Sequence, residues 1–78
     1  MTTVRFFGPA RVAAGHSEVK LAGATVGQVL ASAEARFGEG LARVLATSRI
    51  WVNGEPATSS DPVGDGDEVA ILPPVSGG

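Results

Sequence analysis

The feature that most limits the fold of this chain is one helical segment placed between two groups of short β-type runs. The segment begins at Thr25-Val26-Gly27-Gln28, a capping box in which the Thr25 and Gln28 side chains satisfy backbone donors at the helix start. Gly38 provides a left-handed stop at the other end. The apolar residues in between fall on one helical stripe: Val26, Val29, Leu30, Ala33 and Phe37.

The β-type runs alternate polar and apolar residues. Residues 4–7 and 18–21 precede the helix, and we predict a long loop between them because Gly8-Pro9 ends the first run. Residues 49–52 and 68–72 follow the helix, after a weaker helical turn or two around residues 41–45. Asn53-Gly54 predicts a tight turn, and residues 56–58 are a candidate short edge strand.

This order of elements predicts an α+β domain with a mixed sheet of four to five strands covered by one main helix. The first and last strands can then lie parallel at the centre, which is the β-grasp or ubiquitin-like topology. A chain of 78 residues supports one small core. We therefore predict a single β-grasp domain over residues 1–74 and a flexible C-terminal Gly-Gly tail over residues 75–78.

The composition excludes several classes of function. The chain has no cysteine and one histidine, His16, so neither a thiolate nor a multi-histidine metal site is available. No phosphate-binding or dinucleotide-binding motif occurs, so we expect no bound cofactor. The acidic residues near the last strand have the spacing of turn formers and not that of a calcium loop: Asp61, Asp65, Asp67 and Glu68.

Charge and hydropathy indicate which partners and which cellular compartment to expect for the chain. The net charge is -2, Lys20 is the only lysine and the arginines are scattered, so we expect no nucleic-acid partner. The sequence shows no signal peptide and no apolar run long enough for a membrane span. A cytoplasmic protein with no membrane contact is the expectation.

Alternation along the strands predicts an exposed apolar surface. If Val4, Phe6 and their counterparts face the helix, then Phe7, Trp51 and Leu72 face the other side of the sheet. Large apolar groups gathered on an uncovered face are typical of an interaction surface. The alternatives are that the register slips by one residue or that the tail folds over these side chains.

The last six residues have a second pattern that indicates a function, in this case for the C-terminus of the chain. Pro73-Pro74 cannot extend a strand ladder and favours an extended, stiff spacer. Gly77 and Gly78 have no side chain, so their backbone can pass a narrow channel and approach a reactive centre. The C-terminal carboxylate is ionised at neutral pH and can act as a nucleophile. A frayed chain end without function is the plain alternative.

Residues 65–78, which run through Pro73-Pro74-Val75-Ser76-Gly77-Gly78, resemble the C-terminus of the small subunit of molybdopterin synthase, a ubiquitin-like sulfur carrier of the MoaD/ThiS type. The similarity extends to Val4-Arg5-Phe6-Phe7, Arg11 and Gly15, to the Thr25-Val26 helix start and to residues 52–55. Val12 departs from the family, which often has an acidic residue there, and this puts an ion-pair role of Arg11 in doubt.

The resemblance implies a sulfur carrier and not an enzyme on its own. A ubiquitin-activating-type enzyme would use ATP to adenylate Gly78, and a sulfur donor such as a desulfurase would convert the adenylate to a thiocarboxylate. The tail would then enter the large synthase subunit, in a heterotetramer, and pass sulfur to a pyranopterin precursor. The residues expected to contact partners are Phe7, Leu72, Trp51, Pro56, Pro73, Pro74 and Val75, with Arg5 and Arg11 at the rim.

Two other interpretations stay open. One keeps the chemistry and changes the pathway, to thiamine, tRNA thiolation, cysteine synthesis or ubiquitin-like protein modification. The other is a β-grasp binding module with an inert terminus. The Pro-Pro-Val-Ser-Gly-Gly ending favours the molybdopterin pathway, because thiazole carriers usually lack the proline pair.

Overall fold

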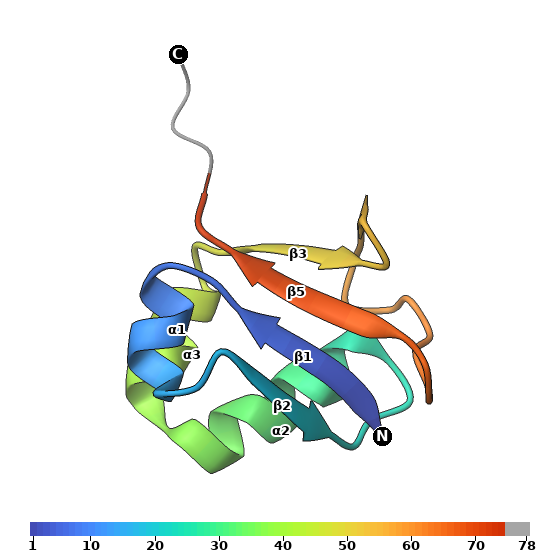
Figure 1. Ribbon diagram of the computed structural model, residues 1–78, viewed down its shortest axis with the longest axis horizontal. Helices are drawn as coiled ribbons and strands as arrows, with labels where there is room; N and C mark the ends of the chain where they lie inside the picture. Colours follow the sequence, from blue (N-terminus) through green and yellow to red (C-terminus); the bar gives the residue numbers. More distant parts are fainter. Residues whose placement is uncertain (75–78) are drawn as a thin grey trace.

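The computed structural model describes residues 1–74, and the predicted tail, including Val75, Gly77 and Gly78, lies outside the described residues. The sheet contains five strands: β1 (Thr2–Phe6), β2 (Glu18–Leu21), β3 (Arg49–Val52), β4 (Glu55–Pro56) and β5 (Glu68–Leu72). Three helices pack with it: α1 (Pro9–Ala14), α2 (Val26–Phe37) and α3 (Glu39–Leu45) (Figure 1).

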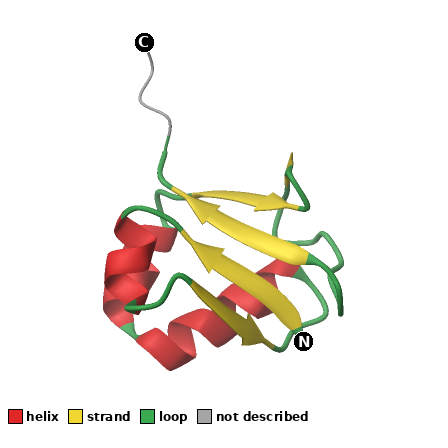
Figure 2. Cartoon of the chain, viewed as in Figure 1, coloured by secondary structure: helices red, strands yellow, loops and turns green. Residues whose placement is uncertain are grey.

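The strand order is β2-β1-β5-β3-β4, with β1 and β5 parallel and side by side in the middle of the sheet. All other neighbours are antiparallel. The predicted parallel pairing of the first and last strands is therefore confirmed. Because β1 and β5 run in the same direction, the end of β1 and the exit of β5 meet at one end of the sheet (Figure 2).

The core lies between the central strands and the helices. Val4 and Phe6 from β1 and Val69 and Ile71 from β5 are at most 1% exposed. They alternate with more exposed residues, as expected of strands with one covered face. Their helical partners are equally buried: Val26, Val29 and Ala33 of α2 and Leu41 of α3.

The start of α2 follows the predicted capping pattern with one difference. The Gln28 N–H donates to Thr25 Oγ1 at 3.2 Å, which satisfies one orphan donor at the helix start. The Gln28 side chain accepts from the Ala24 N–H at 2.9 Å, one residue before the position that a standard capping box uses. Gln28 therefore fixes the entry of the chain into α2.

The prediction of a loop over residues 8–17 is wrong, because α1 occupies most of it. Gly8 has a φ of 54°, Pro9 is the first helical residue and Gly15 ends the helix in the left-handed conformation. A proline at the first position and a glycine just past the end are a known helix signature, and it was present in the sequence. The buried residues of α1 are only alanines, Ala10 and Ala14, so its apolar stripe is weak.

The remaining boundaries differ by one or two residues. β1 begins at Thr2, which is fully buried, and ends at Phe6, so Phe7 follows the strand. The short edge strand is Glu55–Pro56, not 56–58. Asn53 and Gly54 have φ values of 51° and 84°, which confirms the tight turn. Within residues 1–74, α2 is the longest helix at 12 residues, and none is long and apolar enough to cross a membrane.

Candidate functional site

The end of β1 and the exit of β5 form one continuous surface. The Phe7 N–H donates to the Ile71 carbonyl at 3.1 Å, which holds Phe7 beside the last residues of β5. Gly8 then turns the chain with positive φ, and a Cβ on Gly8 would lie 3.5 Å from Pro73 Cγ. Phe7 and Gly8 therefore pack directly against the segment through which the chain leaves the sheet.

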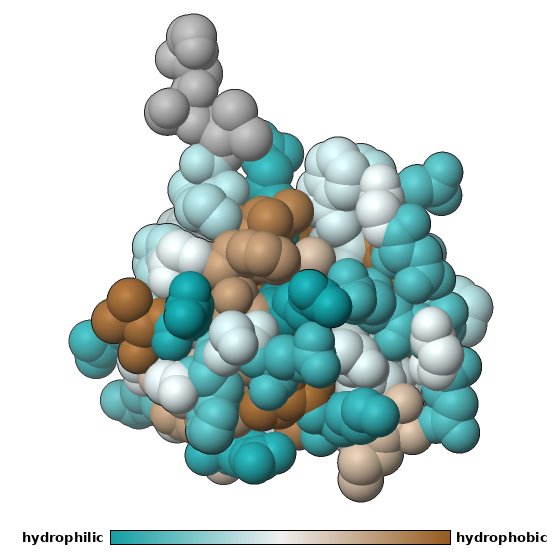
Figure 3. Space-filling view, viewed as in Figure 1, coloured by the Kyte–Doolittle hydropathy of each residue, from teal (hydrophilic) through white to brown (hydrophobic). Residues whose placement is uncertain are grey.

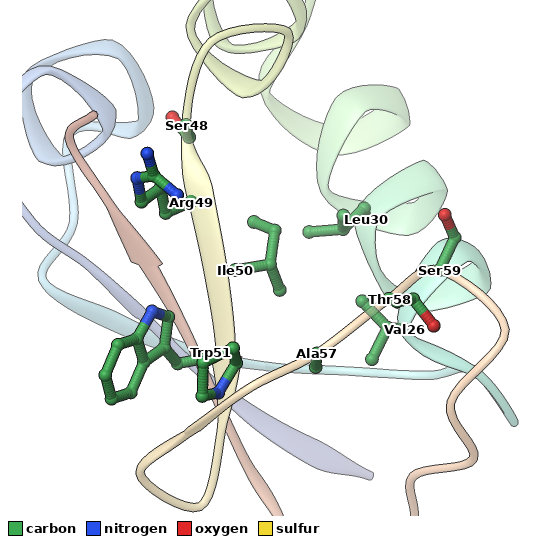
Figure 4. Close-up of a pocket in the computed structure, with 10 residues that line it drawn as sticks. Val26, Leu30, Ser48, Arg49, Ile50, Trp51, Ala57, Thr58 and Ser59 are labelled. Carbon is green, nitrogen blue, oxygen red and sulfur yellow. The ribbon is translucent and has the colours of Figure 1, made fainter. Parts of the chain in front are cut away.

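The face of the sheet opposite the helices, here called the outer face, carries most of the predicted partner residues. In β3 the core side is taken by Ile50, and Trp51 and Arg49 project from the other side of the strand (Figure 4). Trp51 lies opposite Ala70 on one side and Pro56 on the other. Leu72 lies opposite Arg49.

These positions join into a strip that we call the outer patch: Phe7, Leu72, Ala70, Trp51 and Pro56. Phe7 is 41% exposed and Pro56 is exposed, whereas Trp51, Ala70 and Leu72 are half-buried. The space-filling view shows apolar atoms gathered over the C-terminal ends of β1 and β5, directly below the chain exit (Figure 3). The predicted register is therefore confirmed, and the face stays uncovered by residues 1–74.

Arginines border this patch in two different states. Arg5 is held between two carboxylates, with Nε 2.9 Å from Glu68 and a terminal nitrogen 3.3 Å from Glu18. Arg49 is exposed and makes no ion pair with any residue of the part described. Arg5 thus ties three strands together, while Arg49 presents an unneutralised charge beside Leu72.

Arg11 is separate from the outer patch. It lies on α1, is exposed and lines a shallow surface depression with Val12 and His16. No hydrogen bond or ion pair joins it to Phe7 or Leu72 within residues 1–74, so its place at the rim of an interface stays a prediction. Pro73 and Pro74 are exposed directly after β5.

Arg49 is a residue of the outer face that was not among the predicted partner residues. Trp51 was predicted there, and Arg49 lies two positions before it on the same side of β3. The period of two in a strand was sufficient to place Arg49 beside Leu72. Arg49 is the charged residue that lies closest, by strand register, to the exit of β5.

Asp61, Asp65 and Asp67 lie in turns and loops, as predicted, whereas Glu68 is the first residue of β5 and pairs with Arg5. The Asn53 side chain donates to Asp67 at 2.9 Å and the Gly64 N–H donates at 2.9 Å, and these bonds lower the pKa of Asp67 from its ordinary value. The amino group of Met1 pairs with Asp65 and lowers the pKa of that carboxyl. Within residues 1–74 no group of three or more metal-ligating side chains occurs.

The mixed sheet, its parallel central pair and the packed α2 define a ubiquitin-like β-grasp domain. The chain belongs to the ThiS family, whose sequence model matches residues 4–78. The resemblance inferred from the sequence is thereby confirmed at the level of the family, and the fold is that of ThiS- and MoaD-type sulfur carriers and ubiquitin-like modifiers.

Solved structures agree with this assignment. The small archaeal modifier protein 1 from Methanosarcina acetivorans has a TM-score of 0.88 and 30% identity, with 99% of this chain and 95% of that chain covered. A chain of the Amycolatopsis orientalis BexX/CysO complex has a TM-score of 0.79 and 29% identity, with both chains covered completely (100%).

A third similar structure is a chain in the complex of subunits 1 and 2 of molybdopterin-converting factor from Helicobacter pylori. Its TM-score is 0.71 and its identity 29%, with 99% of this chain and 97% of that chain covered. The names of the three proteins indicate different roles, so the likeness defines the fold and the family and leaves the pathway open.

Proposed function

We propose that this chain is the sulfur carrier of molybdopterin biosynthesis and that the carboxyl group of Gly78 carries the sulfur. The observation that most supports this is the family match, which extends through Pro73-Pro74-Val75-Ser76-Gly77-Gly78 to residue 78. These residues directly follow β5, whose exit lies beside Phe7 in the outer patch. A partner that covers the patch would therefore have the start of the tail at the edge of its binding surface.

The proposed chemistry takes place on partner proteins. A Gly78 carboxylate oxygen attacks the α-phosphorus of ATP on a ubiquitin-activating-type enzyme, and pyrophosphate leaves as the acyl adenylate forms. A sulfur donor such as a desulfurase then presents a protein persulfide, whose terminal sulfur attacks the acyl carbon while AMP leaves. A thiol reductant cleaves the resulting acyl disulfide, which releases the thiocarboxylate and leaves a disulfide on the donor. The large subunit of molybdopterin synthase directs that sulfur to a pyranopterin precursor. In this scheme the chain is a non-catalytic small subunit.

The outer patch is the proposed docking surface for the large subunit. Phe7 and Leu72 supply apolar area at the tail exit, and Trp51 and Pro56 extend it across the sheet. Large apolar and aromatic groups at the centre of a patch are typical of residues that dominate binding energy. A heterotetramer with two carriers and a dimer of the large subunit is the proposed assembly.

A second candidate keeps the activated terminus and changes the acceptor. The likeness to the small archaeal modifier protein 1 and to a chain of the BexX/CysO complex favours it, because those structures are as similar as the molybdopterin-converting factor. In that case the Gly78 carboxyl would be transferred to a protein amine, or its sulfur would serve thiamine, tRNA thiolation or cysteine synthesis. An inert binding module is the remaining alternative.

A reconstituted transfer assay separates these functions. The thiocarboxylated chain is mixed with the large subunit and the pyranopterin precursor, and dithiolene product is measured. The matched control is the same chain without Gly78, because every strand and helix of residues 1–74 lies before Pro73. Product with the intact chain alone supports the proposal. Absence of product, together with an amide-linked conjugate on another protein, would assign the modifier function instead.

A further inference from the structure

The outer edge of β3 is only partly covered by its neighbour. β4 pairs with Trp51 and Val52, and the Ala57 N–H adds one bond to the Ile50 carbonyl at 3.0 Å. Beyond Ala57 the chain leaves β3, because the Ser59 and Asp61 carbonyls accept from the Gly27 and Val26 N–H groups at the start of α2. The first half of β3 therefore has no strand beside it on this outer edge in the described structure, while its other edge pairs with β5.

This divergence leaves backbone groups of β3 unpaired. The register with β5 and the bond from Asn53 to Glu68 show that residues 49, 51 and 53 face β5. The Ser48 carbonyl and both backbone groups of Ile50 consequently point to the outer edge, whereas the Ser48 N–H donates to the Leu45 carbonyl. No acceptor for the Ile50 N–H and no donor for the Ser48 carbonyl occurs within residues 1–74. An unpaired edge of this kind is a template for another extended chain.

An apolar groove adjoins the unpaired edge. Its walls come from α2, β3 and residues 57–59, and Figure 4 shows Ile50 and Leu30 pointing toward one another across it. The apolar residues that line this β3 groove are Val26, Leu30, Ile50, Ala57, Trp51 and Pro56, of which the last two also belong to the outer patch. Serine and threonine side chains form most of its polar lining: Ser48, Thr58 and Ser59. Arg49, at the lip, is its only charged residue.

We propose that the β3 groove binds an extended segment of a partner protein in which an apolar residue is followed by an acidic one. The segment lies parallel to β3, and one of its residues bridges the edge: its N–H donates to the Ser48 carbonyl and its carbonyl accepts from the Ile50 N–H. The parallel direction is favoured because one residue then satisfies both groups and leaves the place of Ala57 undisturbed.

The side-chain preferences of the segment follow from alternation. The bridging residue lies opposite Arg49 and points to the outer face, where a carboxylate forms a cross-strand pair with the guanidinium. The preceding residue lies opposite Ser48 and points into the groove toward Leu30, where a branched apolar side chain fits. The following residue must turn away from Ala57, so a glycine suits that position. This site adjoins the outer patch at Trp51 and Pro56 but does not include Phe7 or Leu72, and it is independent of the Gly78 chemistry.

The probe is the synthetic peptide acetyl-Ser-Val-Thr-Val-Glu-Gly-Ser-amide, titrated into the full isotope-labelled chain and followed by NMR. In the free chain the Ile50 amide should exchange rapidly with solvent, whereas the Ala57 amide should be protected by its bond to Ile50. On addition of peptide the NMR signal of the Ile50 amide should shift, and its hydrogen should exchange with solvent more slowly. The signals of Leu30 should also shift, and those of Phe7 should not. The same peptide with lysine in place of glutamate should bind about three to ten times more weakly.

Charge reversal provides the matched test. Arg49→Glu should invert the preference between the two peptides, and Arg43→Glu, the same change on the exposed surface of α3, should leave it unchanged. Shifts confined to Phe7 and Leu72, or an unchanged preference in Arg49→Glu, would overturn the proposal. Slow exchange of the Ile50 amide in the free protein would also overturn the proposal, whether or not the exchange depends on protein concentration. The edge of β3 would then already be paired, either within one molecule or with a second copy of the chain.

Discussion

Truncation of Phe7 tests whether the outer patch binds the large subunit. A phenylalanine buries about 150–250 Å² when fully covered, and Phe7 is 41% exposed, so about 80 Å² remains for a partner to cover. At about 25 cal/mol per Å² this area is worth about 2 kcal/mol. Phe7→Ala should therefore raise the dissociation constant roughly thirtyfold.

Calorimetric titration of the variant against the large subunit measures this change. The free energy of unfolding should fall by less than for a core truncation such as Leu41→Ala, because Phe7 follows β1 and lies outside the core although part of its side chain is covered. Val12→Ala is the matched control: Val12 is 84% exposed on α1, away from the sheet, and its truncation should leave the affinity as it is. Wild-type affinity in Phe7→Ala, or an equal loss in Val12→Ala, would refute the role of the patch.

Three further predictions concern the fold. Leu41→Ala should lower the free energy of unfolding by about 2–5 kcal/mol in urea titrations, because Leu41 is fully buried and leaves a cavity; a loss below that range would mean that the site collapses. Thr25→Ala should cost about 1 kcal/mol through the lost cap at Gln28, and an unchanged midpoint would contradict this. Since the folded pKa of Asp67 is lowered, its contribution is present above its unfolded pKa and is lost as pH falls through the folded pKa. The stability difference between the wild type and Asp67→Asn should therefore shrink as the pH falls below about 4, measured by urea unfolding across that range.

The topology could be predicted from the sequence because, in most of this chain, the local sequence patterns favour the same helices and strands that the packed fold requires. The Thr25 cap, the stripe on α2 and the alternation in residues 49–52 and 68–72 each specify one structure. The loop prediction for residues 8–17 failed because α1 is short and buries only alanines, so its pattern is weak although the Pro9 and Gly15 signals were present.

The candidate site was predictable in part for the same reason. A period of two placed Trp51 and Leu72 on the outer face, and the structure bears out that orientation. The β3 groove was not predictable, because it depends on where residues 57–61 leave β3 for α2. That path is fixed by backbone bonds between segments more than 30 residues apart, such as Gly27 N–H to the Ser59 carbonyl, which no local pattern reveals.

The central claim is that sulfur is carried on the Gly78 carboxyl group. The most direct measurement is the intact mass of the chain after incubation with the activating enzyme, ATP and a sulfur donor, with fragmentation to locate the change. We predict a mass increase equal to the replacement of one oxygen by sulfur, located at Gly78 and lost when Gly78 is deleted. An unchanged mass with an active enzyme and donor, or sulfur located elsewhere in the chain, would contradict it.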